Sequence, residues 1–311
     1  MFKKAIDLIQ KSNSIAILSH VNPDADTIGS MLGLYIALKT LKKKIYLFNT
    51  ADKIDKKYDF LPMLSKIKNS LPDRYDLIIT VDCANLERTG VNIKNLPIIN
   101  FDHHKTNTLF GDINIIRENF ASTSMIIYEF IQNSNLRISP ECATCLYAAL
   151  ADDSGFFQYK RVDKKTFEIA KNLVEYGAKP PKIASFLNQR NSLAKIRLMQ
   201  LYINSIELKK DAMICISKLT VEDYEKTGAT LSDSDTFVQI GLSLATVKLS
   251  IFIYEINSEK AKFSLRSKDN IDCSSIALLY KGGGHSNAAG FTANIKDIDD
   301  IIENILKKVS L

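Results

Sequence analysis

The chain of 311 residues lacks any long apolar run and any long run of charge of one sign. No stretch approaches the roughly 18 consecutive apolar residues that a membrane-spanning helix needs, so we expect no membrane association. Lysine and arginine total 41 against 35 for aspartate and glutamate, a net charge of +6. That excess is too mild to indicate a nucleic-acid-binding arm, although it is compatible with an anionic substrate.

Cysteine is also scarce, with five residues in the whole chain. This small, odd number is typical of a reducing compartment, and we predict a cytoplasmic protein. Cys142 and Cys145 form a Cys-x-x-Cys pair, but no second pair completes a zinc ribbon. We expect the two side chains on one face of a buried helix.

The short motifs of several enzyme classes are absent as well. The sequence contains no G-x-S-x-G, no G-x-x-x-x-G-K-[ST], no H-E-x-x-H and no G-x-G-x-x-G after a strand. These absences argue against serine hydrolases, P-loop nucleotidases, zinc proteases and dinucleotide-binding enzymes.

The composition is that of a globular protein, with 46% hydrophobic and 24% charged residues. The length suggests two domains of roughly 150 residues each. Short apolar runs alternate with helical patterns in the first half, which predicts an α/β fold with a mainly parallel sheet. Its predicted strands are 15–19, 44–48, 76–81 and 97–101, and its predicted helices are 28–41, 122–132, 141–151 and 163–176.

We divide the chain into a first domain (1–182), a helical connector (183–210) and a smaller mixed α/β domain (211–311). The predicted strands of the last domain are 213–219, 249–256, 262–266 and 291–294. Its predicted helices are 235–245, 274–281 and 298–309.

Residues that can bind metals follow three of the predicted strands. The first strand is followed by His20, Asp24 and Asp26, the third by Asp82, and the fourth by Asp102, His103 and His104; Asp152 and Asp153 follow a helix. An aspartate after a strand is commonly a helix cap or a turn residue, so each cluster alone is weak. However, three of the four histidines lie at this predicted sheet edge, where open parallel sheets bind ligands.

The combination is consistent with two divalent metal ions. Asp24, Asp26, Asp82 and Asp153 together carry four negative charges, which two divalent ions would balance. Mixed carboxylate and imidazole ligands favour Mn²⁺ or a similar ion over Mg²⁺. Two such ions suit an in-line displacement at phosphorus.

The only dense glycine loop is Gly282-Gly283-Gly284, followed by His285. Its main-chain amides could bind an anion, with the imidazole adding a hydrogen bond to phosphate. An ordinary tight turn explains the same residues equally well.

These motifs resemble the DHH phosphoesterase family. The resemblance is carried by His20-Val-Asn-Pro-Asp24-Ala-Asp26-Thr-Ile-Gly29-Ser30, Asp82, Asp102-His103-His104 and Asp153-Ser154-Gly155, in that order. Arg266-Ser267 and the segment from Gly282 to Gly290 resemble the DHHA1 domain that follows in this family. Ala25 stands where a glycine is common, and Asp152 where a small hydroxyl residue is common, so we assign no ligand role to Asp152.

The resemblance implies a role for each matched position. His20, Asp24 and Asp82 would hold one metal ion, and Asp26, Asp82, His103 and Asp153 the other. His104 would contact the scissile phosphate, and Asp102 would orient the histidines. Arg266, Gly282, Gly283, Gly284 and His285 would bind substrate.

The short, two-domain members of the family imply a function. We expect an Mn²⁺-dependent hydrolase, with Mg²⁺ or Co²⁺ as alternatives. It would degrade very short single-stranded oligoribonucleotides to 5′-mononucleotides and convert 3′-phosphoadenosine 5′-phosphate (pAp) to AMP. A phosphodiesterase for linear or cyclic dinucleotides such as pGpG or c-di-AMP is the alternative enzyme, and a nucleotide-binding sensor the alternative without catalysis. Homodimerisation is left open.

Overall fold

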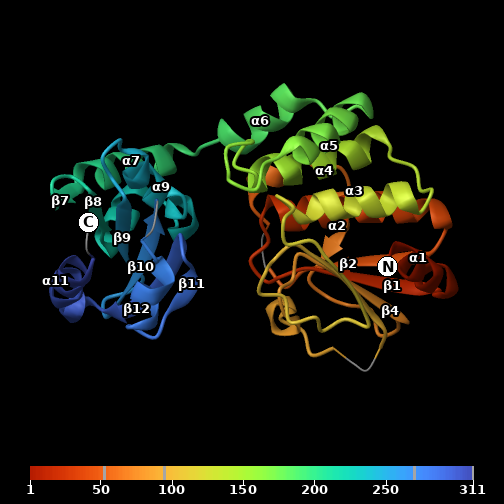
Figure 1. Ribbon diagram of the computed structural model, residues 1–311, viewed down its shortest axis with the longest axis horizontal. Coiled ribbons are helices and arrows are strands. Elements are labelled where there is room, and N and C mark those ends of the chain that lie inside the picture. Colours follow the sequence, from red (N-terminus) through yellow and green to blue (C-terminus); the bar gives the residue numbers. More distant parts are fainter. Residues whose placement is uncertain (52–53, 94–95, 269–270, 310–311) are drawn as a thin grey trace. The chain divides into compact units, whose positions relative to one another are not determined.

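The computed structural model describes residues 1–51, 54–93, 96–268 and 271–309 (Figure 1). The chain divides into two compact units, Met1–Arg190 and Asn191–Leu311. The division falls inside the segment 183–210 that we assigned to a connector. The limits 1–182 and 211–311 stay predictions, and residues 310–311 lie outside the described residues. No helix in the described ranges is long and apolar enough to cross a membrane.

The first unit contains a six-stranded parallel sheet in the order β3-β2-β1-β4-β5-β6. This confirms the predicted parallel α/β fold, and the four predicted strands match β1, β2, β4 and β5. The strand bounds are Ser14–Leu18 (β1), Lys44–Phe48 (β2), Ile67–Lys68 (β3), Leu77–Val81 (β4), Ile98–Asp102 (β5) and Ile113–Ile116 (β6). The chain runs outward from β1 in both directions, so the strand order reverses between β1 and β4. In open parallel sheets, ligands commonly bind at the carboxyl ends of the strands at such a reversal.

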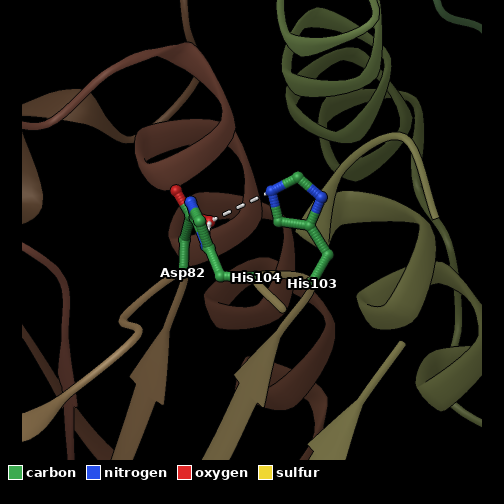
Figure 2. A group of neighbouring side chains, drawn as sticks. All are labelled: Asp82, His103 and His104. Atoms are coloured by element: carbon green, nitrogen blue, oxygen red, sulfur yellow. Dashed lines mark ion pairs between the residues drawn. The ribbon is translucent and has the colours of Figure 1, made fainter. Parts of the chain in front are cut away.

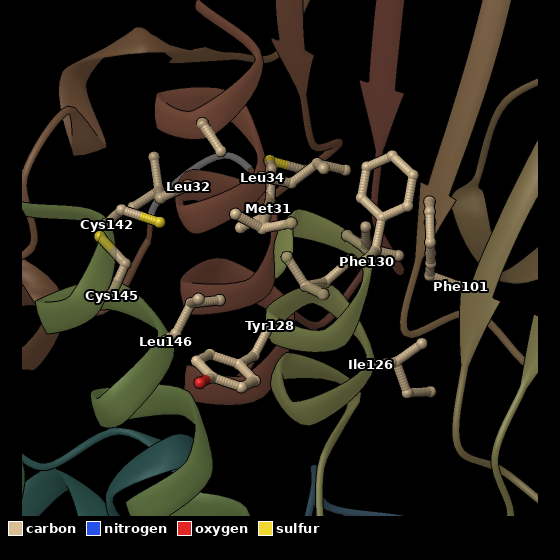
Figure 3. Packing of buried hydrophobic residues seen from close by; sticks show 14 of the residues in the cluster. Met31, Leu32, Leu34, Phe101, Ile126, Tyr128, Phe130, Cys142, Cys145 and Leu146 are labelled. Carbon is tan, nitrogen blue, oxygen red and sulfur yellow. The ribbon is translucent and has the colours of Figure 1, made fainter. Parts of the chain in front are cut away.

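Both faces of this sheet are buried. In β1, Ile15 and Ile17 belong to the core beneath the helices, while Ala16 and Leu18 belong to a smaller core on the opposite face. Figure 3 shows part of the larger core, where Met31, Phe101 and Phe130 pack together. Burial on two faces explains why the strands read as continuous apolar runs. The helices of this unit are Phe2–Lys11 (α1), Ala25–Leu38 (α2), Thr123–Asn133 (α3), Pro140–Asp153 (α4), Lys164–Glu175 (α5) and Pro180–Asn188 (α6).

Helices α2 and α4 pack unusually closely because two glycines on α2 face α4. A Cβ atom on Gly29 would lie 2.4 Å from the carbonyl oxygen of Cys145, and one on Gly33 would lie 2.5 Å from a methyl group of Leu146. Gly29 also faces Ala149, so the two helices run antiparallel. The last turn of α4, which carries Asp153, therefore lies beside the first turn of α2.

All five cysteines are free and buried. Cys142 and Cys145 lie on the buried side of α4, as predicted, and the Cys142 thiol donates to the carbonyl oxygen of Gly33 at 3.3 Å. Figure 3 shows both side chains in the core. The Cys-x-x-Cys pair is part of the helix packing.

The second unit is a smaller mixed α/β domain, as predicted. Its sheet has the order β11-β12-β10-β9-β8-β7, in which β8 and β9 are parallel and the other neighbours antiparallel. The strands are Glu207–Lys209 (β7), Ile214–Leu219 (β8), Leu249–Glu255 (β9), Lys260–Ser267 (β10), Gly283–His285 (β11) and Ala288–Asn294 (β12). The helices are Leu193–Asn204 (α7), Val221–Thr227 (α8), Phe237–Ser243 (α9), Cys273–Leu278 (α10) and Ile298–Lys308 (α11).

The connector is not one continuous helix. Helix α6 ends at Asn188 and α7 begins at Leu193. Ser192 ends the interruption, because its side chain accepts a hydrogen bond from the main-chain N–H of Lys195 at 3.0 Å. A serine in this position caps the exposed amides of a new helix, and this local signal separates the two helices.

Candidate active site

His20, Asp24 and Asp26 lie between the end of β1 and the first turn of α2. His20 and Asp26 are buried, whereas Asp24 is exposed. Asp24 caps α2, since its Oδ1 accepts a hydrogen bond from the main-chain N–H of Thr27 at 2.9 Å. Its other oxygen, Oδ2, lies 4.0 Å from Nε2 of His20. The cap uses Oδ1 and leaves Oδ2 facing His20, so a helix-cap role is compatible with a ligand role for this residue.

Asp82 lies in the centre of the cluster, directly after β4. Its backbone adopts φ +58°, a left-handed conformation that aspartate tolerates better than most residues. Its Oδ2 lies 3.5 Å from Nε2 of His20. Its Oδ1 lies 3.7 Å from Nε2 of His103 and 3.5 Å from Nδ1 of His104. The two oxygens of one carboxylate therefore face different histidines.

The rings of His103 and His104 are oriented by different partners. Nδ1 of His104 donates to Oδ1 of the fully buried Asp102 at 2.7 Å. Nδ1 of His103 donates instead to the carbonyl oxygen of Phe120 at 3.1 Å. Asp102 reaches His103 only through the main-chain N–H, at 2.8 Å. Because both Nδ1 atoms carry the proton, Nε2 is the nitrogen left for a metal ion or a substrate on each ring.

Figure 2 shows the ring of His103 pointing toward the carboxylate of Asp82, with a dashed line marking their ion pair. His104 comes from the adjacent position on the chain after β5 and lies on the near side of Asp82 in this view. The rings of the two histidines meet edge to face, with centroids 4.7 Å apart.

Asp153 is the last residue of α4, and its carboxylate reaches the same cluster from the end of that helix. Its Oδ2 lies 3.4 Å from Nε2 of His103, and Oδ2 of Asp26 lies 3.9 Å from that nitrogen. Oδ2 of Asp153 is buried yet forms no hydrogen bond within the described part of the chain. A buried carboxylate oxygen of this kind needs a positive partner, which a metal ion would supply.

The potential ligand atoms fall into three groups in which every pair lies within 4.8 Å. One group is His20, Asp24 and Asp82; another is Asp26, His103 and Asp153; the third is Asp82, His103 and His104. All six residues predicted as metal ligands are brought together. Asp152 belongs to none of the groups found among the described residues.

The charges of the cluster are unbalanced without cations. Burial raises the pKa of Asp26 to about 7, and the negative charge of Asp82 adds to that effect. Burial, together with the charges of Asp26 and Asp82, raises the pKa of Asp153 well above its usual range. Burial also acts to raise the pKa of Asp82, but a hydrogen bond and positive charge from the histidines lower it below its usual value. These residues fit a cation-binding site, because divalent ions would stabilise all of these carboxylates in the charged form.

The neighbours of His104 favour the charged form of its ring. Burial alone would lower the pKa of its ring, but the hydrogen bond to Asp102 and the charges of Asp82 and Asp102 raise the pKa above its usual value. A proton on this ring suits contact with an anionic group.

The predicted substrate-binding residues lie in the second unit. Arg266 on β10 and His285 on β11 are both paired in register with Ala288 on β12. Residues paired in this way point to the same face of the sheet, so the guanidinium group of Arg266 and the imidazole ring of His285 share one rung and one face. Gly283 and Gly284 belong to β11, an edge strand paired with β12, so the glycine segment is part of a hairpin.

Sequence reasoning did not find several polar residues around the ligands. The hydroxyl groups of Thr27 and Thr123 donate to Asp82, and Ser122 donates to Asp26 at 2.8 Å. Each lies at the start of a helix, where serine and threonine are commonly caps. Thr27 also lies inside the first family motif, but the motif implied no role for it. A position at the start of a helix does not distinguish a cap from a residue that contacts a ligand.

The fold and the site together define a two-domain protein with a cluster of carboxylate and imidazole ligands at the carboxyl edge of a parallel sheet. Residues 14–150 match the DHH family N-terminal domain, and residues 213–310 match the DHHA1 domain. The chain belongs to the DHH family, as its motifs predict.

Individual relatives extend over almost the whole chain. A bifunctional oligoribonuclease and PAP phosphatase NrnA from Thermus thermophilus is 30% identical over 95% of this chain and 89% of its own length. The crystal structure of an exopolyphosphatase-related protein from Bacteroides fragilis has a TM-score of 0.91 and 28% identity, covering 99% of this chain and 95% of that chain. A pGpG-specific phosphodiesterase from Vibrio shares the fold, with a TM-score of 0.51 and 15% identity over 95% of this chain and 98% of that one.

Proposed function

We propose that this chain is a metal-dependent phosphodiesterase that hydrolyses very short oligoribonucleotides to 5′-mononucleotides and converts pAp to AMP. The observation that carries the proposal is the position of Asp82, whose two oxygens face two different groups of metal-type ligands. The similarity to the Thermus relative, whose name states both activities, supports the choice of substrates.

The ligand groups suggest how two metal ions would be held. His20, Asp24 and Asp82 would bind one, and Asp26, Asp82, His103 and Asp153 the other. Mn²⁺ suits this mixture of oxygen and nitrogen ligands. When bound, two such ions supply a water of lowered pKa and neutralise charge on the phosphoryl oxygens.

The protein's own residues would position the substrate against that centre. His104 would donate a hydrogen bond from its free Nε2 to a non-bridging oxygen of the scissile phosphate. Asp102 keeps the ring in the required orientation through the bond to Nδ1. In the second unit, Arg266, His285 and the glycine segment Gly282, Gly283 and Gly284 would bind the terminal phosphate of the substrate. The main-chain N–H of Gly282 already donates to the carbonyl oxygen of Ala277 at 2.9 Å, so it is not one of the phosphate donors.

One chemistry covers both proposed activities. Conversion of pAp to AMP breaks the bond between phosphorus and the 3′ oxygen of a 5′-phosphorylated nucleoside. Removal of the first nucleotide from a 5′-phosphorylated dinucleotide breaks the same kind of bond with the same leaving oxygen. A site that binds the 5′-phosphate and cleaves at the 3′ oxygen therefore performs both reactions.

Product analysis tests the proposal. The protein is incubated with Mn²⁺ and 5′-labelled oligoribonucleotides of two to ten residues, with pAp, with pGpG and with a cyclic dinucleotide. We expect 5′-mononucleotides from the shortest oligonucleotides of mixed sequence and AMP from pAp. Turnover of pGpG or the cyclic dinucleotide alone would replace the proposal by a dinucleotide-specific enzyme. Tight binding with no turnover of any substrate would indicate a sensor.

A further inference from the structure

Each oxygen of the Asp82 carboxylate is held by its own threonine hydroxyl group. Thr27, in the first turn of α2, donates to Oδ2 at 2.7 Å. Thr123, the first residue of α3, donates to Oδ1 at 3.0 Å. Both threonines are fully buried. With a donor on each oxygen, the carboxylate is held against rotation about its Cβ–Cγ bond.

The two threonines also contact different sets of ligands. The hydroxyl oxygen of Thr27 lies 2.5 Å from Nε2 of His20, and Oδ2, the oxygen it holds, faces that same histidine. The main-chain N–H of Thr123 donates to Oδ2 of Asp26 at 2.7 Å, and Oδ1, the oxygen it holds, faces His103. Both threonines contact the shared ligand Asp82. Apart from Asp82, Thr27 contacts His20 and Asp24, and Thr123 contacts Asp26, so their remaining ligand contacts belong to different groups.

The hydrogen-bond inventory of Thr27 is compatible with metal binding at His20. A hydroxyl group has one proton, which Thr27 donates to Asp82, so its contact with His20 uses the N–H of the ring as donor. The contact with His20 and the bond to Asp82 therefore use different parts of the hydroxyl group, its oxygen and its proton. The two contacts do not compete for the hydroxyl proton.

We propose that Thr27 and Thr123 are positioning residues, each of which orients the ligands of a different metal ion. Thr27 orients ligands of the ion held by His20, Asp24 and Asp82. Thr123 orients ligands of the ion held by Asp26, Asp82, His103 and Asp153. This inference depends on the two-metal centre proposed above. Partners that orient metal ligands typically contribute ten- to hundredfold to metal affinity.

The expected consequence is a selective loss of one metal ion. Thr27→Ala removes the hydroxyl that holds Oδ2, and we expect one Mn²⁺ to bind at least ~tenfold more weakly while the other is retained. Thr123→Ala does the same for the opposite ion. Thr27→Ser and Thr123→Ser keep the hydroxyl and should restore both affinities, which separates the effect of the bond from that of the lost methyl group.

Calorimetric Mn²⁺ titration with electron paramagnetic resonance measures this directly, because a coupled pair of Mn²⁺ ions and a single ion have different spectra. Thr80→Ala is the matched control: Thr80 is buried in β4 two residues before Asp82, but its hydroxyl donates to Asn100 at 3.0 Å instead of to a ligand. It should bind two ions like the unmodified protein. Thermal unfolding of every variant checks that the fold is kept.

A second substitution identifies which ion remains. Asp153→Asn removes a ligand from the Thr123 group only. When Asp153→Asn is added to Thr27→Ala, the remaining Mn²⁺ ion should bind more weakly. When it is added to Thr123→Ala, the affinity for the remaining ion should be largely unchanged. The assignment would be overturned if either threonine variant lowered the affinity for both ions equally, or if neither variant lowered the affinity for any ion. If the unmodified protein bound fewer than two ions, the two-metal centre itself would fail instead.

Discussion

At the scale of single residues, Asp82 has two structural roles that few residue types can fulfil together. Its left-handed backbone at φ +58° turns the chain at the end of β4, and its carboxylate reaches both ligand groups. Asparagine tolerates the same backbone conformation but carries no charge. One substitution can therefore remove the negative charge and keep the backbone conformation.

Asp82→Asn should keep the fold and lose catalysis. We expect kcat to fall by more than about a hundredfold, beyond the range typical of residues that only orient a ligand, with weakened binding of both metal ions. Steady-state kinetics on pAp and Mn²⁺ titration measure these effects. Asp76→Asn is the control, since Asp76 accepts main-chain hydrogen bonds from Asn13 and Ser14 at 2.9 Å, away from the ligand groups. Two tightly bound ions and intact turnover in Asp82→Asn would contradict the assignment of a bridging ligand.

His104 and His103 are neighbours in the chain with different expected roles. Because Asp102 holds the ring of His104 through Nδ1, we expect His104→Ala to lower kcat while two Mn²⁺ ions stay bound. His103→Ala should lose a metal ion, since Nε2 of His103 faces Asp26, Asp82 and Asp153. Metal analysis after dialysis distinguishes the two variants. Loss of an ion from His104→Ala would show that His104 is itself a ligand.

At the scale of elements, the contact between α2 and α4 brings Asp153 to the other ligands. The Cβ of an alanine at position 29 would meet the main-chain oxygen of Cys145 at 2.4 Å, which cannot move without moving α4. At position 33 it would meet the end of the Leu146 side chain at 2.5 Å, and that side chain can rotate.

Gly29→Ala should therefore cost more than Gly33→Ala. Overpacking of a core typically costs about 1–3 kcal/mol, and we expect Gly29→Ala at the upper end of that range. It should also weaken Mn²⁺ binding, because it displaces the helix that carries Asp153. Urea unfolding and Mn²⁺ titration of the two variants provide the comparison. Equal stability of both variants and unchanged metal affinity would show that this helix contact does not position the site.

The elements that carry the ligands were predictable from sequence, and the reason is physical. β1, β4 and β5 are buried on both faces, so they appear as short, mainly apolar runs that lead to His20, Asp82 and Asp102. β3 and β6 have only two and four residues and are mostly half-exposed, so they lack that signal. The contacts of Thr27 and Thr123 depend on how α2 and α3 pack against the sheet, which no local pattern in the sequence encodes.

At the scale of the whole molecule, the two units carry different parts of the proposed chemistry. The metal-type ligands all belong to the first unit, whereas Arg266 and His285 share a rung of the sheet in the second. The division predicts that metal binding and recognition of the terminal phosphate can be impaired separately.

Removal of the 5′-phosphate from a dinucleotide substrate should lower kcat/KM by at least ~tenfold, because a charge-assisted hydrogen bond contributes about 1.5–3 kcal/mol. His285→Ala should erase much of this preference without changing Mn²⁺ affinity. Lys307→Ala, which removes an exposed positive charge from α11 of the same unit, should leave the preference intact. Equal rates for the phosphorylated and the 5′-hydroxyl dinucleotide would mean that the second unit recognises base or sugar.

In the proposed centre, Asp82 lies between two metal ions. Anomalous X-ray scattering from crystals grown with Mn²⁺ tests this position, because each bound Mn²⁺ produces its own peak. We predict two peaks, one beside His20 and Asp24 and the other beside Asp26, His103 and Asp153, with an oxygen of Asp82 next to each. A single peak, or two peaks of which one does not contact Asp82, would contradict the two-metal centre.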